Sequence, residues 1–284
     1  MVNISLGELS VAYDLEGPEN APTVVLAHCF AADRGFWRPH LPALVGFRVL
    51  RFDARGHGET SRPRGPYTID DMTDDAIAVM DRLGIEHAHY VGVSMGGMVG
   101  QHLGFGHGDR LRSLTLVNTA PRYARAQQQL WRDRAAEVLD RGTEHLHDPM
   151  MRRWFTDREV DAVGPGYQYM SAAFRRLHPE TFAACALAMA DLDTVDHLSR
   201  IRIPTMVIAA PGDPGIPPEM SKLLATQIPG SALQWLTPAR HLASLEHVKR
   251  FNSLLQRFLT EAIKNGYEDH GPNAPERTSQ SHYP

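Results

Sequence analysis

Residues 89–97 read His-Tyr-Val-Gly-Val-Ser-Met-Gly-Gly, and this stretch decides which fold we expect. The first five residues are typical of a buried strand, and residues 95–107 have the composition of a helix. Ser94 therefore stands on a strand-to-helix turn between Gly92 and Gly96. Such a turn strains the serine backbone and needs small neighbours, because the flanking chain passes close by. It also places Ser94 at a helix N-terminus, where N–H groups favour a developing negative charge. The pattern favours a nucleophilic serine over a plain buried turn.

Short apolar runs alternate with helical segments on both sides of this stretch. Strands are expected at 4–6, 9–15, 23–28, 47–52, 89–93, 111–117, 205–209 and 232–236, and helices at 68–83, 95–107, 218–227 and 242–263. This alternation predicts an α/β fold with a mostly parallel central sheet flanked by helices.

The strand pattern stops between residues 121 and 196, where helical sequence rich in arginine, methionine and aromatic residues takes its place. We therefore expect one core, made of residues 1–120 and 197–264, interrupted by a helical cap of residues 121–196. Residues 265–284 are polar with few apolar side chains and are expected to form a disordered tail.

A nucleophilic serine needs a base, and the base needs an acid to orient it. Asp213 follows the strand at 205–209, and His241 follows the strand at 232–236, which gives the chain order Ser-Asp-His expected for a serine on this kind of turn. The alternatives are a turn aspartate in Gly-Asp-Pro-Gly and a surface histidine before a helix. The loop after the strand at 111–117 holds Asn118, which cannot act as a carboxylate, and this favours Asp213 as the acid.

Two backbone N–H groups must stabilise the oxyanion that forms in such a reaction. Met95 follows the nucleophile, and we expect the second donor to be Phe30, in the loop after the strand at 23–28. Cys29 is a rival nucleophile, but no helix N-terminus follows it, so we expect a packed thiol. The segment 53–58, Asp-Ala-Arg-Gly-His-Gly, is expected to build a tight loop beside the site.

Composition narrows the expected partners. A net charge of −4 gives no basic field for nucleic acid or an anionic membrane. The N-terminus lacks a signal-peptide pattern, and two cysteines make no disulfide framework, so we expect a cytoplasmic protein. Among 15 histidines, the pairs His87/His89 and His145/His147 have no evident third ligand, so no metal and no cofactor is expected.

Taken together, GVSMGG around Ser94, DARGHGETS at 53–61, Asp213 and His241 resemble the α/β-hydrolase family over about residues 3–263. The stretches 109–120, 153–156, 212–218 and 240–246 are similar to 3-oxoadipate enol-lactonases, which hydrolyse a small anionic enol-lactone in the bacterial breakdown of aromatic compounds. Cys29 departs from the family, which usually has glycine after the loop histidine. Its Cβ could alter the loop or narrow the pocket.

The resemblance implies an α/β-hydrolase fold with an inserted cap over the site, and hydrolysis of a carboxylic ester or lactone. Arg152 or Arg153, beside Trp154, would pair with the carboxylate of an anionic lactone, unless both are solvated helix residues. The expected partner is a small-molecule ester or lactone, without nucleic acid or membrane, and a homo-oligomer is left open. Alternatives that keep the triad are C–C bond hydrolysis, acyl transfer and cofactor-free perhydrolysis. A small-molecule receptor is the alternative without catalysis.

Overall fold

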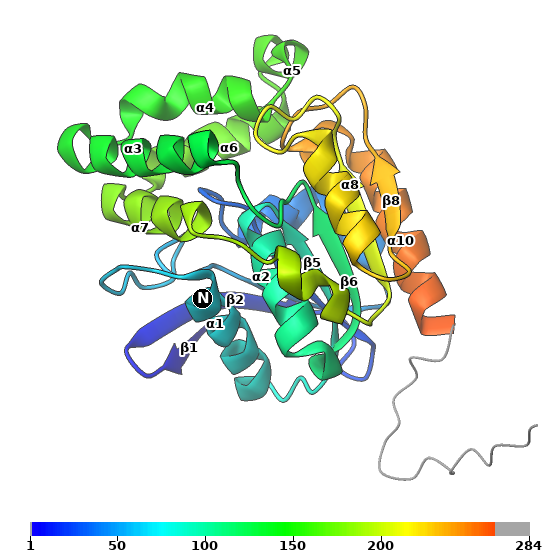
Figure 1. Ribbon diagram of the computed structural model, residues 1–284. Coiled ribbons are helices and arrows are strands. Elements are labelled where there is room, and N and C mark those ends of the chain that lie inside the picture. The colour runs from blue at the N-terminus through cyan, green and yellow to red at the C-terminus, as the bar shows by residue number, and fades with distance from the viewer. Residues whose placement is uncertain (1, 265–284) are drawn as a thin grey trace, which may run out of the picture.

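The computed structural model describes residues 2–264, and its centre is one twisted sheet (Figure 1). Eight strands lie in the order β1-β2-β4-β3-β5-β6-β7-β8. Their bounds are Val2–Leu6 (β1), Leu9–Glu16 (β2), Thr23–Ala27 (β3), Arg48–Phe52 (β4), Ala88–Val93 (β5), Leu111–Val117 (β6), Thr205–Ala209 (β7) and Ala232–Trp235 (β8). The pairs β1–β2 and β2–β4 are antiparallel, and the other neighbours are parallel. The predicted mostly parallel α/β sheet is confirmed.

The central strands are buried along their whole length, because helices and loops cover them. Every residue of β3, β5 and β7 is buried, as expected for continuous apolar runs in a parallel sheet. The helix α2 (Met95–Gly106) packs on β5 and β6 and against α1 (Ile69–Arg82), and α8 (Pro218–Gln227) packs on β7 and β8. The helix α10 (Val248–Lys264) packs on β6 and on the 3-10 helix η1 (Arg34–Leu44).

Between β6 and β7 the chain forms five α-helices, which we call the cap helices: α3 (Arg125–Arg141), α4 (His147–Trp154), α5 (Asp157–Ala162), α6 (Pro165–Arg176) and α7 (Pro179–Ala190). They lie together beyond one end of the sheet, with α3 against α7 and α4 against α6 (Figure 1). The two ends of this segment meet, because Thr194 N–H donates to Pro121 O at 2.9 Å. The exact division into core and cap at 120/121 and 196/197 stays a prediction.

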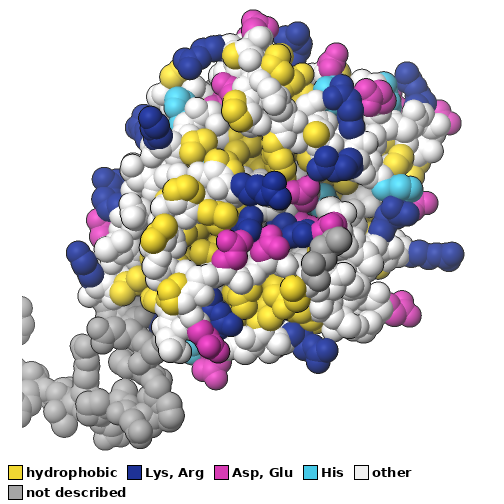
Figure 2. All heavy atoms as spheres, turned by 180° about the vertical axis from the view of Figure 1, so that it is seen from behind, with side chains coloured by type: hydrophobic (Ala, Val, Ile, Leu, Met, Phe, Trp, Pro, Cys, Tyr) yellow, Lys and Arg dark blue, Asp and Glu magenta, His cyan; other side chains and the backbone are white. Residues whose placement is uncertain are grey.

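Some expected elements have other bounds in the structure. The helix predicted at 242–263 is broken into α9 (Ala243–Glu246) and α10, because His247 leaves the helical region with φ −126° and ψ 49°. The predicted tail at 265–284 lies outside the described residues. Within residues 2–264, no helix combines the length and apolar character needed to cross a membrane. Figure 2 shows the face opposite to that of Figure 1, where side chains of both charge signs are interspersed with apolar ones.

Candidate active site

Ser94 lies between β5 and α2 in a strained backbone conformation, with φ 53° and ψ −111°. The close approach of the chain explains both neighbouring glycines. A Cβ on Gly92 would lie 2.1 Å from Gly96 O, and a Cβ on Gly96 would lie 2.4 Å from Ala27 O. Only glycine fits at these two positions without displacing backbone, and the turn therefore holds the Ser94 side chain at the carboxyl end of β5.

The structure brings Ser94, Asp213 and His241 together in one line of contacts. Ser94 Oγ lies 2.9 Å from His241 Nε2, and His241 Nδ1 lies 2.6 Å from Asp213 Oδ2. The three residues are 4%, 8% and 4% exposed in the order Ser94, His241, Asp213, so bulk water is largely kept away from them. With the Nδ1 proton directed at the carboxylate, Nε2 is free to accept the serine proton.

Asp213 is held by donors from three sides. Its Oδ1 accepts the N–H groups of Gly215 (2.7 Å) and Ile216 (3.1 Å), and its Oδ2 also accepts Asn118 Nδ2–H at 3.2 Å. Asn118 follows β6 with φ 42°, a conformation that asparagine tolerates better than most residues. From the sequence, Asn118 is considered only as a residue that cannot serve as the acid. Its place after the strand beside β7 was the signal for its contact with Asp213.

The two expected oxyanion donors are Met95, next to Ser94 in the chain, and Phe30, which lines the same pocket as Ser94. Met95 is the first residue of α2, and Phe30 lines the pocket together with Ser94 and Cys29. Within residues 2–264, no acceptor takes the backbone N–H of either Phe30 or Met95. Both groups are therefore available to an oxygen of a bound molecule.

The loop that carries Phe30 is fixed by the segment after β4. Ala31, at φ 64°, donates its N–H to His57 Nε2 at 3.2 Å, and Ala54 N–H donates to His28 Nε2 at 2.9 Å. Burial, together with the neighbouring His28, lowers the pKa of His57 to about 3. His57 is thus neutral and can accept the Ala31 N–H. The positive φ falls on Ala31, so Cys29 keeps an ordinary backbone in spite of its Cβ.

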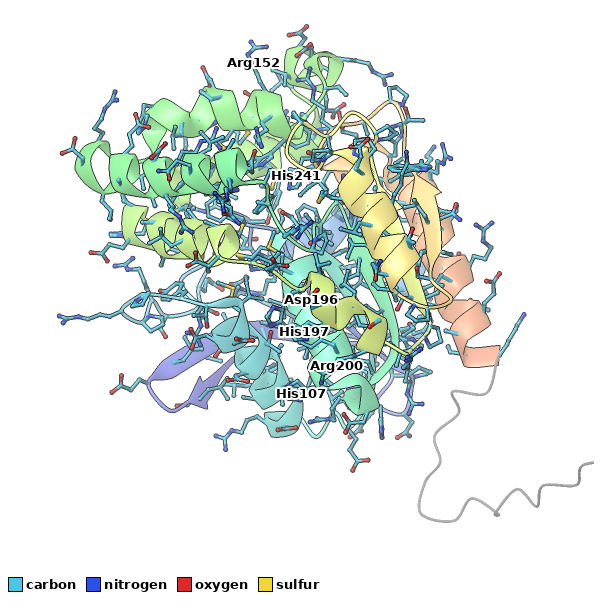
Figure 3. All side chains as sticks on the ribbon, in the orientation of Figure 1. His107, Arg152, Asp196, His197, Arg200 and His241 are labelled. Carbon is cyan, nitrogen blue, oxygen red and sulfur yellow. The ribbon has the colours of Figure 1, made fainter. Side chains whose placement is uncertain are left out.

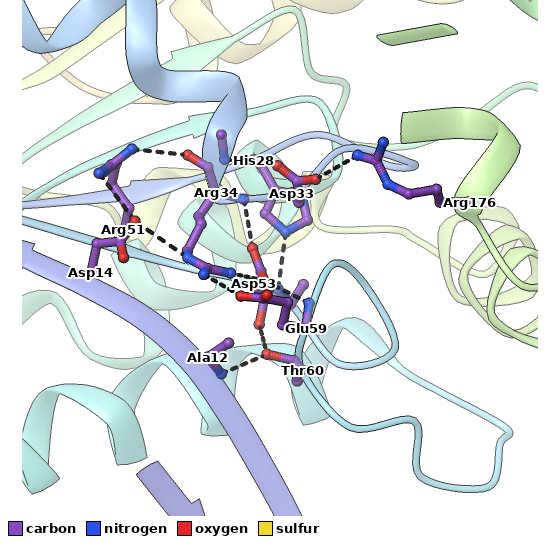
Figure 4. A network of polar contacts seen from close by, with 12 residues as sticks. Ala12, Asp14, His28, Asp33, Arg34, Arg51, Asp53, Glu59, Thr60 and Arg176 are labelled. Carbon is purple, nitrogen blue, oxygen red and sulfur yellow. Dashed lines mark hydrogen bonds and ion pairs between the residues drawn. The ribbon is translucent and has the colours of Figure 1, made fainter. Parts of the chain in front are cut away.

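Beneath this loop lies a charged network centred on the buried Asp53 (Figure 4). Its carboxylate pairs with the Arg34 guanidinium and accepts the N–H groups of Arg34 (2.6 Å) and Glu59 (2.9 Å). Asp33, next in sequence to Arg34, accepts hydrogen bonds from Tyr169 Oη (2.8 Å) and Arg176 Nη2 (3.1 Å) of α6. The segment 53–58 thus supports the site loop, as the sequence led us to expect.

The pocket that contains Ser94 is lined largely by apolar and aromatic side chains, and the cap helices contribute Trp131, Trp154 and Met189 to it. Of the two candidate arginines, Arg153 lines this pocket beside Trp154, and the structure does not bring Arg152 to it. Arg152 is exposed and points outward at the top of the molecule, whereas His241 lies between the cap helices and the sheet (Figure 3).

Nitrogen donors without a partner in residues 2–264 lie on the cap side, with Gln127 and Arg153 lining the pocket and Arg134 close to its Trp131. Among the described residues, Arg153 Nη2, Gln127 Nε2 and Arg134 Nη1 are buried without a hydrogen-bond partner. The Arg134 guanidinium lies 5.4 Å from the ring centroid of Trp131. Burial and the nearby Arg153 lower the pKa of Arg134 to about 10. Sequence reasoning missed Gln127 and Arg134, although Arg134 follows Trp131 by three residues and so shares its helix face.

Comparison with known proteins gives consistent relatives. A family model described as alpha/beta hydrolase fold matches residues 22–248. The 3-oxoadipate enol-lactonase 2 of Acinetobacter baylyi is 30% identical over 250 residues, which cover 88% of this chain and 92% of the relative. A protein of Azorhizobium caulinodans, whose name proposes a carbamate hydrolase, is 30% identical over 273 residues, 90% of this chain and 97% of the relative.

A solved structure extends the likeness to three dimensions. The crystal structure of the enol-lactonase from Burkholderia xenovorans LB400 is 32% identical, has a TM-score of 0.88, and is covered over 100% of its length by 91% of this chain. The similarity to enol-lactonases expected from the sequence is thereby confirmed.

Proposed function

The chain belongs to the alpha/beta hydrolase fold family and is a hydrolase, and we propose that it cleaves a carboxylic ester or lactone through an acyl-enzyme on Ser94. The observation that carries the proposal is the line of contacts from Ser94 Oγ through the His241 ring to Asp213 Oδ2. Similarity to enol-lactonases supports a reaction most like hydrolysis of 3-oxoadipate enol-lactone.

In the proposed first step, Ser94 Oγ attacks the carbonyl carbon while its proton moves to His241 Nε2. The carbonyl oxygen becomes an oxyanion that the N–H groups of Met95 and Phe30 stabilise, each by roughly 3–4 kcal/mol. The C–O bond to the leaving oxygen then breaks, and that oxygen takes the proton from His241. In a lactone the leaving oxygen stays attached to the acyl group. Water then attacks the acyl-enzyme with His241 as base, and the acid is released.

We further propose that the substrate carries an anionic group that pairs with Arg153. The buried Nη2 of Arg153 has no hydrogen-bond partner among the described residues, and a substrate carboxylate would satisfy it with a charge-assisted hydrogen bond. Arg134 would add positive potential from α3, and the aromatic lining would bind the rest of a small substrate.

The test is turnover of a panel of p-nitrophenyl esters and lactones, including the enol-lactone, by the wild type and by Ser94→Ala. We expect turnover that Ser94→Ala abolishes, with an acyl-enzyme burst and phosphonate labelling of Ser94. Absence of Ser94-dependent turnover on every ester and lactone would overturn the proposal. A second candidate, carbamate hydrolysis, is favoured by the Azorhizobium relative, so the panel includes carbamates.

A further inference from the structure

Glu246, at the end of α9, connects the loop of His241 with the cap helices. Its Oε2 accepts the N–H of Arg240, the residue before His241, at 2.8 Å. Its Oε1 accepts both the N–H (2.8 Å) and the hydroxyl (2.5 Å) of Thr156, just after α4. One carboxylate thus takes three donors from two loops that are more than 80 residues apart in sequence.

Further bonds join the same two segments. Leu242 N–H, just after His241, donates to Trp154 O at 3.0 Å. Arg240 Nη1 donates to Arg152 O (2.6 Å) and Phe155 O (3.0 Å), and it pairs with Asp157 at 3.2 Å. The residues on both sides of His241 are therefore bonded to residues 152–157, the segment that carries Arg153 and Trp154 of the pocket.

We propose that Glu246 is a positioning residue that holds the base His241 and the anion-binding Arg153 in fixed positions relative to each other. This inference rests on the proposed function, because it makes Glu246 the residue that couples recognition of the anionic group at Arg153 to proton transfer at His241. Neither loop has regular hydrogen-bonded structure where it meets Glu246, so the carboxylate replaces the missing partners. A misplacement of about 1 Å in such a site can cost on the order of 100-fold in rate.

The experiment compares Glu246→Ala and Glu246→Gln with the wild type on two p-nitrophenyl esters, one the neutral butyrate and one the anionic hemisuccinate. Rates are expressed per active site titrated with a phosphonate. We expect kcat to fall at least about tenfold for both esters in Glu246→Ala, and KM to rise severalfold for the hemisuccinate only. Glu246→Gln keeps the shape of the side chain and one of its oxygens, so its kcat and KM should lie between those of the wild type and of Glu246→Ala. Asp81→Asn, the same carboxylate-to-amide change in an exposed pair with Arg110 at the end of α1, should alter neither.

The same measurements on Arg153→Met and on the double variant with Glu246→Ala separate positioning from mere stability. With Arg153 replaced, Glu246→Ala should lower kcat but no longer change the preference between the two esters. Unchanged kcat per active site with only a lower Tm would overturn the inference, as would an equal change of preference in both backgrounds. If Arg153→Met leaves the preference intact, the recognition half is overturned. Lack of turnover by the wild type on these esters and on every other ester and lactone of the panel would instead overturn the proposed function itself.

Discussion

At the scale of single residues, Asn118 is the contact of the triad that deletion can test most cleanly. Its amide is one of two donors to Asp213 Oδ2, the other being His241. We expect Asn118→Gly, which removes the amide and tolerates the φ of 42°, to lower kcat about tenfold with little change in KM, because Asp213 loses one fixed partner and orients His241 less well.

Thr115→Val provides the control for Asn118→Gly. Thr115 is on β6, the strand that Asn118 follows, and its buried hydroxyl has no partner within residues 2–264, so its loss should leave kcat unchanged. Equal kcat for Asn118→Gly and the wild type would show that Asn118 does not position Asp213.

Cys29 lines the same pocket as Ser94, but the protonation state of its thiol argues against a role as nucleophile. Burial raises the pKa of the Cys29 thiol far above its usual range, so almost none is thiolate at neutral pH. We expect iodoacetamide at pH 8 to leave ester turnover intact and Cys29→Ala to keep it within about threefold of the wild type. Inactivation that tracks alkylation of Cys29 would contradict this assignment.

At the scale of elements, the β5–α2 turn is where backbone packing decides which residues are allowed. We expect Gly96→Ala to lower the free energy of unfolding by about 3 kcal/mol or more, because its Cβ would overlap the carbonyls of Ala27 and His28. Gly106→Ala, at the other end of α2, meets nothing within 4 Å and should be neutral or stabilise by up to about 1 kcal/mol. Urea unfolding of both variants checks this; equal stabilities would refute the packing argument.

The elements also show which parts of the site the sequence can predict. Ser94, Asp213 and His241 each follow a strand. Chain order and the apolar pattern of these strands therefore suffice to predict that the three residues meet at the carboxyl ends of the parallel strands. Gln127 and Arg134 are different, because their lack of hydrogen-bond partners within the described chain becomes visible only when the cap helices are packed together. The break at His247 has a similar origin, since the bonds that fix Glu246 and its loop come from Thr156 of the distant cap segment.

At the scale of the whole molecule, two groups of the polar contacts that join the cap helices to the rest of the chain lie next to the site. One is Asp33, next to the loop of Phe30, with Tyr169 and Arg176. The other is the bonding of Arg240 and Glu246 to residues 152–157. Both contacts end within a few residues of proposed catalytic groups, so a movement of the cap relative to the sheet would also disturb the oxyanion loop or His241.

The pH dependence of stability is a property of the whole molecule, because several histidines are buried in different parts of it. Burial lowers the pKa of His40 and of His89 to about 4 and, with the help of His28, that of His57 to about 3. In the unfolded chain these groups titrate near 6.5, so below that pH the unfolded state binds more protons than the folded state. The contribution of these three histidines to the free energy of unfolding is fully present above about pH 6.5, and it is lost as the pH falls toward their pKa values in the folded state. In this pH range each histidine lowers the free energy of unfolding by at most about 1.4 kcal/mol per pH unit.

We therefore expect the free energy of unfolding to fall by about 5 kcal/mol between pH 7 and pH 5, measured by urea denaturation at both values. In His40→Gln the difference between the two pH values should shrink by roughly a third, whatever the overall stability of the variant, because one of the three histidines whose pKa falls to about 3 or 4 is replaced. The exposed His87→Gln should leave the difference unchanged. A His40→Gln protein that loses as much stability as the wild type would show that His40 takes up its proton in the folded state, and that another group causes the acid sensitivity.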